Sequence, residues 1–202
     1  MWAMKPRIGK PLPVGNEGSG IVTEAGENAK HLIGKVVSAV GGGMYAQYRV
    51  LPAMACIEMP DDIEPKDCAS SFVNPLTALG MVETMKSEGH SALIHTAAAS
   101  NLGQMLVKIC LADNIPLINI VRKPEQVDLL KSLGAEYVCN SSDDNFKDSL
   151  VEAIKATNAT LAFDATGGGE LSGRILSCME IAMRANMKLS LIHISEPTRR
   201  RT

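Results

Sequence analysis

The chain has 202 residues, of which 46% are hydrophobic, and its formal net charge at pH 7 is −2. That length and apolar content suffice for a buried core in one large domain or two small ones. The balanced charge provides no basic face for nucleic acid, and no apolar run reaches the roughly 18 residues of a membrane span. A small molecule is therefore the expected partner.

Residues 15–52 contain short β-rich runs, at residues 20–25 and 35–40, separated by glycine-rich turns. Such spacing predicts a small antiparallel barrel, with Tyr45 and Tyr48 as core and edge residues. The chain enters this region within a few residues of Met1. We therefore expect an internal fragment of a longer protein, with part of a barrel domain over residues 1–66.

From Asp67 onward, predicted strands alternate with predicted helices. The strands are expected at residues 92–96, 116–121, 136–139 and 160–164, and the helices at residues 75–86, 104–112, 124–133 and 145–155. Alternation predicts right-handed βαβ units and a parallel Rossmann-type sheet over residues 67–188. Complete sheets of this type have the strand order 3-2-1-4-5-6, so about four strands are present and strand 160–164 is an exposed edge that favours self-association.

Small residues join the first strand of this sheet to the following helix. In the dinucleotide fingerprint GxGxxG, the glycines allow a tight turn, close approach of a pyrophosphate and helix packing. The three glycine positions are occupied by Ala98, Ser100 and Gly103. We predict a pyrophosphate site from these residues with Asn101 and Leu102, because N–H groups at a helix start bind phosphate. A βα turn that binds no ligand is the alternative.

Two cations, Arg122 and Lys123, follow the second strand of the sheet. The difference of 122 and 103 places Arg122 19 residues after Gly103, close to the position that reads the adenosine ribose in Rossmann folds. A guanidinium matches a 2′-phosphate bidentately, whereas an acidic residue would bind the 2′-hydroxyl of NAD. Arg122 therefore indicates NADP(H) as the cofactor, and the alternative is a pair of solvated cations at a strand end.

A second turn of small residues, Thr166-Gly167-Gly168, follows the strand at residues 160–164. Ligands of open α/β sheets bind at the carboxyl ends of strands, so this loop is expected beside the nicotinamide, with a flexible connector as the alternative. Asn74 and Thr77 begin a helix whose N-terminus would present N–H groups toward a cleft. An ordinary N-cap at Asn74 is equally consistent with the sequence. His95 is expected to be a packed strand residue rather than a base.

Five cysteines are scattered without a close pair, which favours reduced core thiols and an intracellular compartment. The last residues, 189–202, resemble the in-frame translation of a transposase adapter used in DNA sequencing libraries. We expect this tail to be non-native and attach no function to it.

The barrel segment, the helix signature Asn74-Pro75-Leu76-Thr77-Ala78, the turn 97–103 and the closing Asp164-Ala165-Thr166-Gly167-Gly168 occur in this order. Together they resemble the medium-chain dehydrogenase/reductase superfamily over roughly residues 13–188, above all its quinone oxidoreductase and enoyl-thioester reductase branches. The resemblance implies a GroES-like barrel, hydride transfer from NADPH to a quinone or conjugated enone or enoyl substrate, and Asn74 and Thr77 near the nicotinamide. It also implies a homodimer. The compartment that we expect is the cytoplasm, with mitochondria as the alternative because the N-terminal segment is expected to be missing.

One departure from the superfamily concerns zinc. Asn16-Glu17 stands where zinc-dependent alcohol dehydrogenases carry a His-Glu pair, and the closely spaced cysteines of a structural zinc lobe are missing from the sequence. An amide is a poor zinc ligand compared with imidazole, so we expect no metal. A zinc-type alcohol dehydrogenase relative and a catalytically silent NADP(H)-binding protein are the alternative functions. No catalytic residue is assigned.

Overall fold

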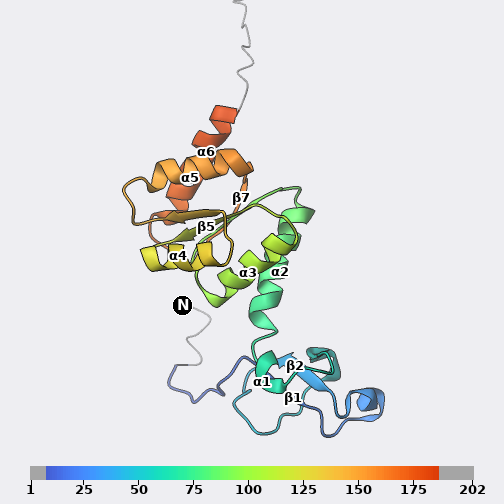
Figure 1. The fold of residues 1–202 in the computed structure, drawn as a ribbon. Coiled ribbons are helices and arrows are strands. Elements are labelled where there is room, and N and C mark those ends of the chain that lie inside the picture. The colour runs from blue at the N-terminus through green and yellow to red at the C-terminus, as the bar shows by residue number, and fades with distance from the viewer. Residues whose placement is uncertain (1–7, 187–202) are drawn as a thin grey trace, which may run out of the picture. The chain divides into compact units, whose positions relative to one another are not determined.

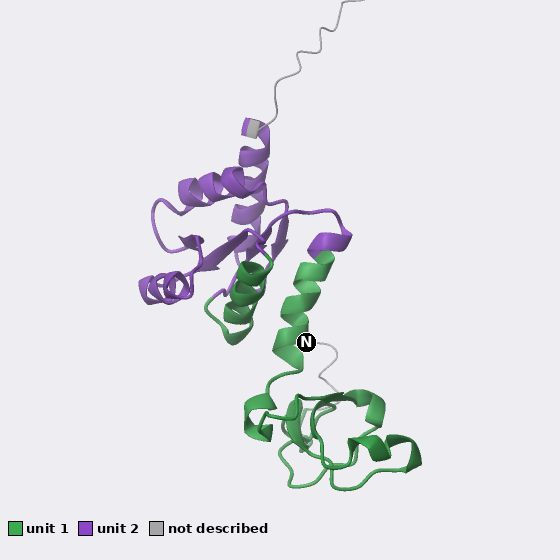
Figure 2. Cartoon of the chain, turned by 45° about the vertical axis from the view of Figure 1, so that its right-hand side comes forward, with its two compact units in different colours: residues 1–84, 99–113 green, residues 85–98, 114–202 purple. Residues whose placement is uncertain are grey.

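The computed structural model describes residues 8–186, which form two compact units (Figures 1 and 2). The first unit contains residues 8–84 and 99–113 of the described chain, and the second contains residues 85–98 and 114–186. Helix α2 (Val73–Ser87) runs from one unit into the other. The domain boundary between residues 66 and 67 stays a prediction, and the expected adapter-derived tail at residues 189–202 lies outside the described residues.

The described part of the first unit contains a three-stranded antiparallel sheet in the order β1-β2-β3. Its strands are β1 (Glu17–Ile21), β2 (Val36–Val40) and β3 (Cys56–Glu58). The same unit also contains two 3-10 helices, η2 (Glu27–Leu32) and η3 (Ala53–Ala55), and the short helix α1 (Pro65–Cys68). Hydroxyl groups attach α1 to the sheet, since Ser19 Oγ donates to the Pro65 carbonyl and Ser38 Oγ to the Cys68 carbonyl. The expected partial barrel is confirmed, with its first strand at residues 17–21 rather than 20–25.

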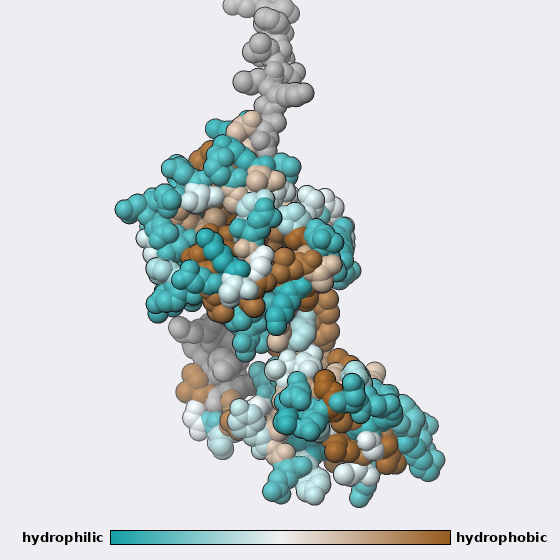
Figure 3. Space-filling model, in the orientation of Figure 1, coloured by the Kyte–Doolittle hydropathy of each residue, from teal (hydrophilic) through white to brown (hydrophobic). Residues whose placement is uncertain are grey.

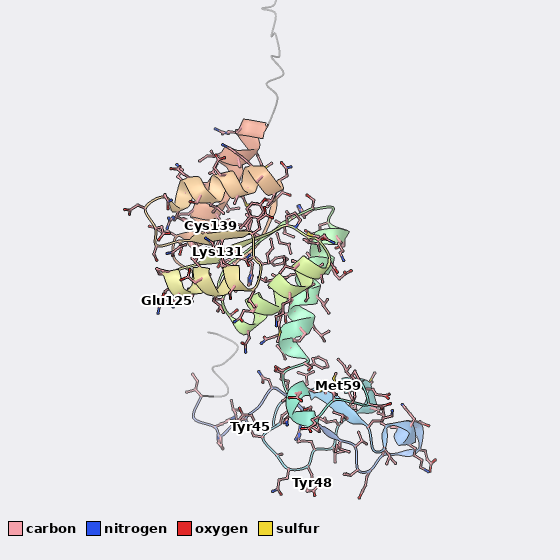
Figure 4. The ribbon with its side chains drawn as sticks, in the orientation of Figure 1. Tyr45, Tyr48, Met59, Glu125, Lys131 and Cys139 are labelled. Atoms are coloured by element: carbon pink, nitrogen blue, oxygen red, sulfur yellow. The ribbon has the colours of Figure 1, made fainter. Side chains whose placement is uncertain are left out.

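Tyr45 and Tyr48 are neither core nor edge residues, because the chain forms an irregular loop where we expected barrel strands. Gly42 and Gly43, directly after β2, have φ angles of 73° and 65°. These left-handed conformations end the strand. The two tyrosine side chains of the loop are 83% and 81% exposed, and Figure 4 shows them on this part of the first unit. The prediction was wrong here.

A carboxylate from β1 binds the N-terminus of α2. Glu17 Oε2 accepts hydrogen bonds from the backbone N–H groups of Phe72, at 3.1 Å, and of Val73, at 2.7 Å. An acceptor at this place compensates N–H groups that the helix itself leaves unpaired, and its negative charge suits the helix dipole. The alternative that Asn74 is an ordinary N-cap is wrong, because the helix begins at Val73 and Asn74 lies in its first turn.

The described part of the second unit contains a four-stranded parallel sheet in the order β6-β5-β4-β7. The strands are β4 (Leu93–His95), β5 (Leu117–Val121), β6 (Tyr137–Asn140) and β7 (Leu161–Phe163), each within two residues of its expected bounds. Helices α4 (Pro124–Ser132), α5 (Phe146–Thr157) and α6 (Leu171–Asn186) belong to this unit, whereas α3 (Asn101–Ala112) belongs to the first. The predicted Rossmann-type sheet is confirmed.

Aliphatic side chains fill the space between this sheet and α5 and α6. Ile94, Ile118 and Ile120 are at most 1% exposed and pack with Phe146 of α5 and Ile175 of α6. Each such side chain contributes about 1.5–3 kcal/mol on burial. In Figure 1, α5 and α6 lie on one side of the strands and α4 on the other. Because the four strands are parallel, their carboxyl ends all lie along one edge of the sheet.

No helix within the described residues is long and apolar enough to cross a membrane. Hydrophilic side chains cover much of the face shown in Figure 3, with apolar residues among them on both units.

Candidate functional site

The turn after β4 begins with an alanine in a left-handed conformation. Ala97 has a φ of 51°, and the N–H of Ala98 donates to the carbonyl of Ile120 in β5 at 3.2 Å. The methyl group of Ala98 is fully buried. The Ala98 amide is therefore used inside the sheet, and the contribution of this residue to a ligand site is its small size.

Ser100 caps helix α3, which begins at Asn101, three residues before its expected start. The Ser100 hydroxyl oxygen accepts from the Gly103 N–H at 3.2 Å, so its own proton remains to donate to a phosphate oxygen. Asn101 is exposed, Leu102 is half-buried and Gly103 is buried. The 12-residue helix directs its partial positive charge toward this first turn, which suits an anion.

Arg122 and Lys123 lie exposed at the carboxyl end of β5. Two neighbours fix the Arg122 backbone, because its N–H donates to Gln126 Oε1 at 3.2 Å and its carbonyl accepts from Ser142 Oγ at 3.0 Å. Within residues 8–186 the Arg122 guanidinium has neither a hydrogen bond nor an ion pair. A fixed backbone with an unpaired planar cation fits recognition of an external phosphate.

The loop after β7 is held by the carboxylate of Asp164. Its Oδ1 accepts from Thr96 Oγ1 at 2.7 Å, from Thr166 Oγ1 at 2.6 Å and from the Thr166 N–H at 3.0 Å. Its Oδ2 accepts from Ser172 Oγ at 2.5 Å. Thr96 Oγ1 in turn accepts from the Ala165 N–H at 2.8 Å. One carboxylate thus joins the end of β4, the loop and the first turn of α6.

Two groups near the end of β4 have strongly shifted pKa values, for different reasons. Hydrogen bonds from Ser172, Thr166 and Thr96 hold the pKa of Asp164 far below its usual range, so the carboxylate is ionised. Burial lowers the pKa of His95 to about 4, and its imidazole is neutral at pH 7. His95 is fully buried in β4, as expected of a packed strand residue.

The predicted residues Asn74 and Thr77 lie in the first turns of α2, where two N–H groups are already taken by Glu17. The Thr77 hydroxyl donates to the Val73 carbonyl at 2.7 Å, so it bonds to its own helix. Their expected place near a nicotinamide stays a prediction. Within the described residues, no group of three or more His, Cys, Asp or Glu side chains is arranged to hold a metal ion.

Sequence reasoning gave no role to Thr96, Asp164 or Ser172, which the structure brings together. An aspartate that ends an apolar strand and stands two residues before a threonine is the local signal for an Asx-turn. Thr96 lies 68 residues away from Asp164, and no local pattern points to it. Thr166, Gly167 and Gly168 occupy the loop as predicted, and all three are exposed.

The strand order is β6-β5-β4-β7: from β4 the chain continues to β5 and β6 on one side, and β7 then adds to the other side of β4. The strand order therefore reverses between β4 and β7. Open α/β sheets bind ligands outside the carboxyl ends of the strands at such a point, and the Thr96–Asp164 hydrogen bond lies there. The parallel sheet and its helices have a Rossmann-type fold, and the segment before them is part of a GroES-like barrel.

Residues 102–185 match the family model described as zinc-binding dehydrogenase. Prostaglandin reductase-3 of Mus musculus is 31% identical over 139 residues, which are 67% of this chain and 36% of that protein. The mitochondrial enoyl-[acyl-carrier-protein] reductase of Homo sapiens is 33% identical over 141 residues, 66% of this chain and 38% of that protein. The chain thus spans little more than a third of the length of these curated relatives.

Two solved structures have the same fold. One, described as an NADPH:quinone reductase of Mesorhizobium loti, superposes with a TM-score of 0.72 at 36% identity and covers 82% of this chain and 49% of that one. The other, Escherichia coli quinone oxidoreductase complexed with NADPH, has a TM-score of 0.72 at 22% identity over 84% and 53% of the two chains. The chain belongs to the medium-chain dehydrogenase/reductase superfamily, and these similar proteins are described as quinone and enoyl reductases.

Proposed function

We propose that this chain binds NADP(H) and that the whole protein is an NADPH-dependent oxidoreductase acting on a quinone or a conjugated enone or enoyl substrate without zinc. The observation that carries the proposal is Arg122, whose backbone is fixed at the carboxyl end of β5 and whose guanidinium has no partner within residues 8–186. Relatives described as NADPH:quinone reductase and enoyl reductase support it.

Different residues of the chain would bind different parts of the cofactor. Ser100 and the free N–H groups of the first turn of α3 would bind the pyrophosphate, and Ala98 would leave room for it. Arg122, with Lys123 beside it, would bind the 2′-phosphate. The loop containing Thr166, Gly167 and Gly168 would lie along the nicotinamide. When bound, the reduced nicotinamide supplies a hydride, and the protein orients it and excludes water.

The proposed absence of zinc rests on Asn16, an amide where zinc-dependent members of the superfamily have a histidine. Stoichiometric zinc in metal analysis of the full-length protein would instead establish a zinc-type alcohol dehydrogenase relative. Tight NADPH binding without oxidation by any acceptor of a quinone and enone panel would establish a catalytically silent binding protein.

For the whole protein we further propose a small-molecule substrate, a homodimer and a cytoplasmic location. The human relative described as mitochondrial makes mitochondria the alternative compartment. Sedimentation equilibrium of the full-length protein tests the dimer, and fractionation of the source cells tests the compartment.

The cofactor proposal is tested with Arg122→Gln, which removes the guanidinium and its charge but keeps a polar side chain. A charged hydrogen bond of about 1.5–3 kcal/mol corresponds to a roughly ten- to hundredfold weaker binding of NADPH. Binding of NADH, which has no 2′-phosphate, should not change. Isothermal titration calorimetry measures both dissociation constants.

Arg184→Gln is the matched control, because Arg184 is an exposed cation of α6 whose ion pair with Glu180 lies at the surface. This variant should bind both coenzymes like the unchanged chain. If Arg122→Gln leaves the ratio of the two dissociation constants unaltered, Arg122 does not read the 2′-phosphate and the NADP(H) assignment loses its support.

A further inference from the structure

The glycines of the loop at residues 165–169 make few packing contacts. Gly167, Gly168 and Gly169 have φ angles of 60°, 81° and 69°, and a Cβ atom added to any of them would meet nothing within 4 Å. Glycine has no side chain that could pack against the sheet, and its backbone has many accessible conformations. The position of the loop therefore depends on the contacts at its two ends.

The carboxylate of Asp164 supplies the contacts at both ends. It accepts from the backbone and hydroxyl of Thr166 at the start of the loop and from Ser172 in the first turn of α6, after the loop. The fourth hydrogen bond ties the carboxylate to the end of β4, since Thr96 is 1% exposed and donates to the same Oδ1 as Thr166. Thr96 Oγ1 also accepts from the Ala165 N–H, which closes the ring of contacts.

We propose that Asp164 is a positioning residue for the nicotinamide half of the coenzyme: its carboxylate holds residues 165–168 at the carboxyl end of β4, where the strand order reverses. This inference rests on the proposed function, and it adds a role to a residue that touches the loop rather than the ligand. A loop held in one place before binding loses less conformational entropy when the ligand arrives. Loss of the carboxylate should therefore weaken contacts to the nicotinamide alone.

The test compares two ligands that differ in the nicotinamide half. NADPH contains it, whereas adenosine 2′,5′-bisphosphate has only the adenosine with its 2′- and 5′-phosphates. For Asp164→Ala we expect NADPH to bind at least about tenfold more weakly, as for the loss of several charged hydrogen bonds. Binding of adenosine 2′,5′-bisphosphate should stay within about twofold. A general loss of stability would weaken both ligands together.

Asp164→Asn serves as the conservative variant. Its amide oxygen still accepts from Thr96 and Thr166, and its NH₂ group can donate to Ser172 Oγ instead of accepting from it. We expect it to recover most of the NADPH affinity that Asp164→Ala loses. Asp148→Ala, at an exposed carboxylate in the first turn of α5, is the matched control and should bind both ligands like the unchanged chain.

A measurement without coenzyme tests the geometry separately. In the unliganded chain, the amide protons of Ala165 and Thr166 should exchange with solvent faster in Asp164→Ala, because these N–H groups donate within the ring of contacts. Unchanged exchange would overturn the proposed restraint. Faster exchange with unchanged NADPH affinity would also overturn the inference, because the loop would then be held for a reason unrelated to the coenzyme.

Two milder variants apply if Asp164→Ala does not fold. Ser172→Ala and Thr166→Val each remove hydroxyl donors and keep the carboxylate, and each should weaken NADPH by roughly two- to fivefold while adenosine 2′,5′-bisphosphate is unaffected. Equal weakening of the two ligands, or of neither, contradicts the inference. If the unchanged chain binds both ligands but Asp164→Ala does not weaken NADPH selectively, the inference fails alone. If the unchanged chain does not bind NADPH, the proposed function itself fails.

Discussion

At the scale of single residues, His95 and Asn119 form an unusual polar pair inside the second unit. They are register partners in β4 and β5, so their side chains lie on the same face of the sheet, and both are at most 1% exposed. Asn119 Nδ2 donates to the carbonyls of Leu117 and Tyr137, whereas Asn119 Oδ1 and both ring nitrogens of His95 have no hydrogen-bond partner among the described residues. Buried polar atoms without partners cost about 1–3 kcal/mol each.

We predict that acid destabilises the chain through His95. Its pKa is lowered to about 4 in the folded state, so between pH 6.5 and 4 the unfolded chain binds a proton that the folded chain does not. The free energy of unfolding is not reduced by this group above pH 6.5. It falls as the pH is lowered from 6.5 to 4, by an amount on the order of 3 kcal/mol in total. Urea unfolding between pH 4 and 8 measures it.

His95→Leu removes the titrating group and two unpartnered nitrogens at similar volume. The variant should have a flatter pH profile over the same window and, at pH 7, a stability within about 1 kcal/mol of the unchanged chain or above it. His31→Leu, at an exposed position, is the control, and its profile should follow that of the unchanged chain. A His95→Leu profile as steep as that of the unchanged chain would show that other groups cause the acid sensitivity.

At the scale of elements, the start of α2 depends on a residue 56 positions before it. Glu17 caps the N-terminus of α2 with two hydrogen bonds, and the one from the Val73 N–H is the shorter. For Glu17→Ala we expect a loss of about 1–2 kcal/mol in the free energy of unfolding, because two N–H groups lose a charged acceptor. Urea unfolding followed by circular dichroism measures the loss.

Glu27→Ala is the control for that prediction. Glu27 forms an ion pair with Lys30 at 2.6 Å, but the side chains are 84% and 58% exposed. An exposed pair of this kind contributes less than about 1 kcal/mol, so the control should be nearly neutral. Equal losses in the two variants would mean that the contact between Glu17 and α2 has no special weight.

For two glycines of the second unit, we expect the same substitution to change stability in opposite directions. Gly168→Ala should destabilise the chain by about 1–2 kcal/mol, because an L-residue is strained at a φ of 81° even where space is open. Gly173→Ala, inside α6 and equally unobstructed, should stabilise it by up to about 1 kcal/mol through helix propensity. Thermal melting of the two variants compares them directly, and effects of the same sign would contradict the argument.

The elements of the second unit were largely predictable because their signals are local. The apolar strand Leu117–Val121 and the helix bounded by Pro124 and Gly134 carry their own start and stop residues. Contacts between distant segments were not predictable: the Glu17 cap spans 56 residues and the Thr96–Asp164 bond spans 68. In the candidate site, the turn and Arg122 followed from spacing, whereas the ring of contacts around Asp164 depends on hydroxyl directions that no sequence pattern specifies.

At the scale of the whole molecule, the described sheet of the second unit has two edge strands, β6 and β7. The β7 segment Leu161–Phe163 is apolar and pairs only with β4 among the described strands. In the first unit, Val50 and Met54 are 98% and 95% exposed, and Figure 3 shows apolar residues at the surface. Open strand edges and exposed apolar side chains both favour association between copies.

We therefore predict that the chain of 202 residues self-associates at micromolar concentration. Sedimentation velocity over a range of concentrations measures it. Because we attribute the association chiefly to the β7 edge, the double variant Val50→Ser with Met54→Ser should associate nearly as strongly. A monodisperse monomer that melts cooperatively would contradict the prediction, and a double variant that is fully monomeric would move the cause to the first unit.

The three glycines after Thr166 occupy backbone angles that are the mirror image of those natural for L-amino acids. The same angles are the relaxed ones for a residue of opposite chirality, so D-alanine at position 168 would fit where L-alanine is strained. A semisynthetic chain with that residue should melt at a higher temperature than the natural chain, since it restricts the unfolded state without strain in the folded one. The handedness of a single carbon atom would then decide whether a methyl group strengthens or weakens this loop.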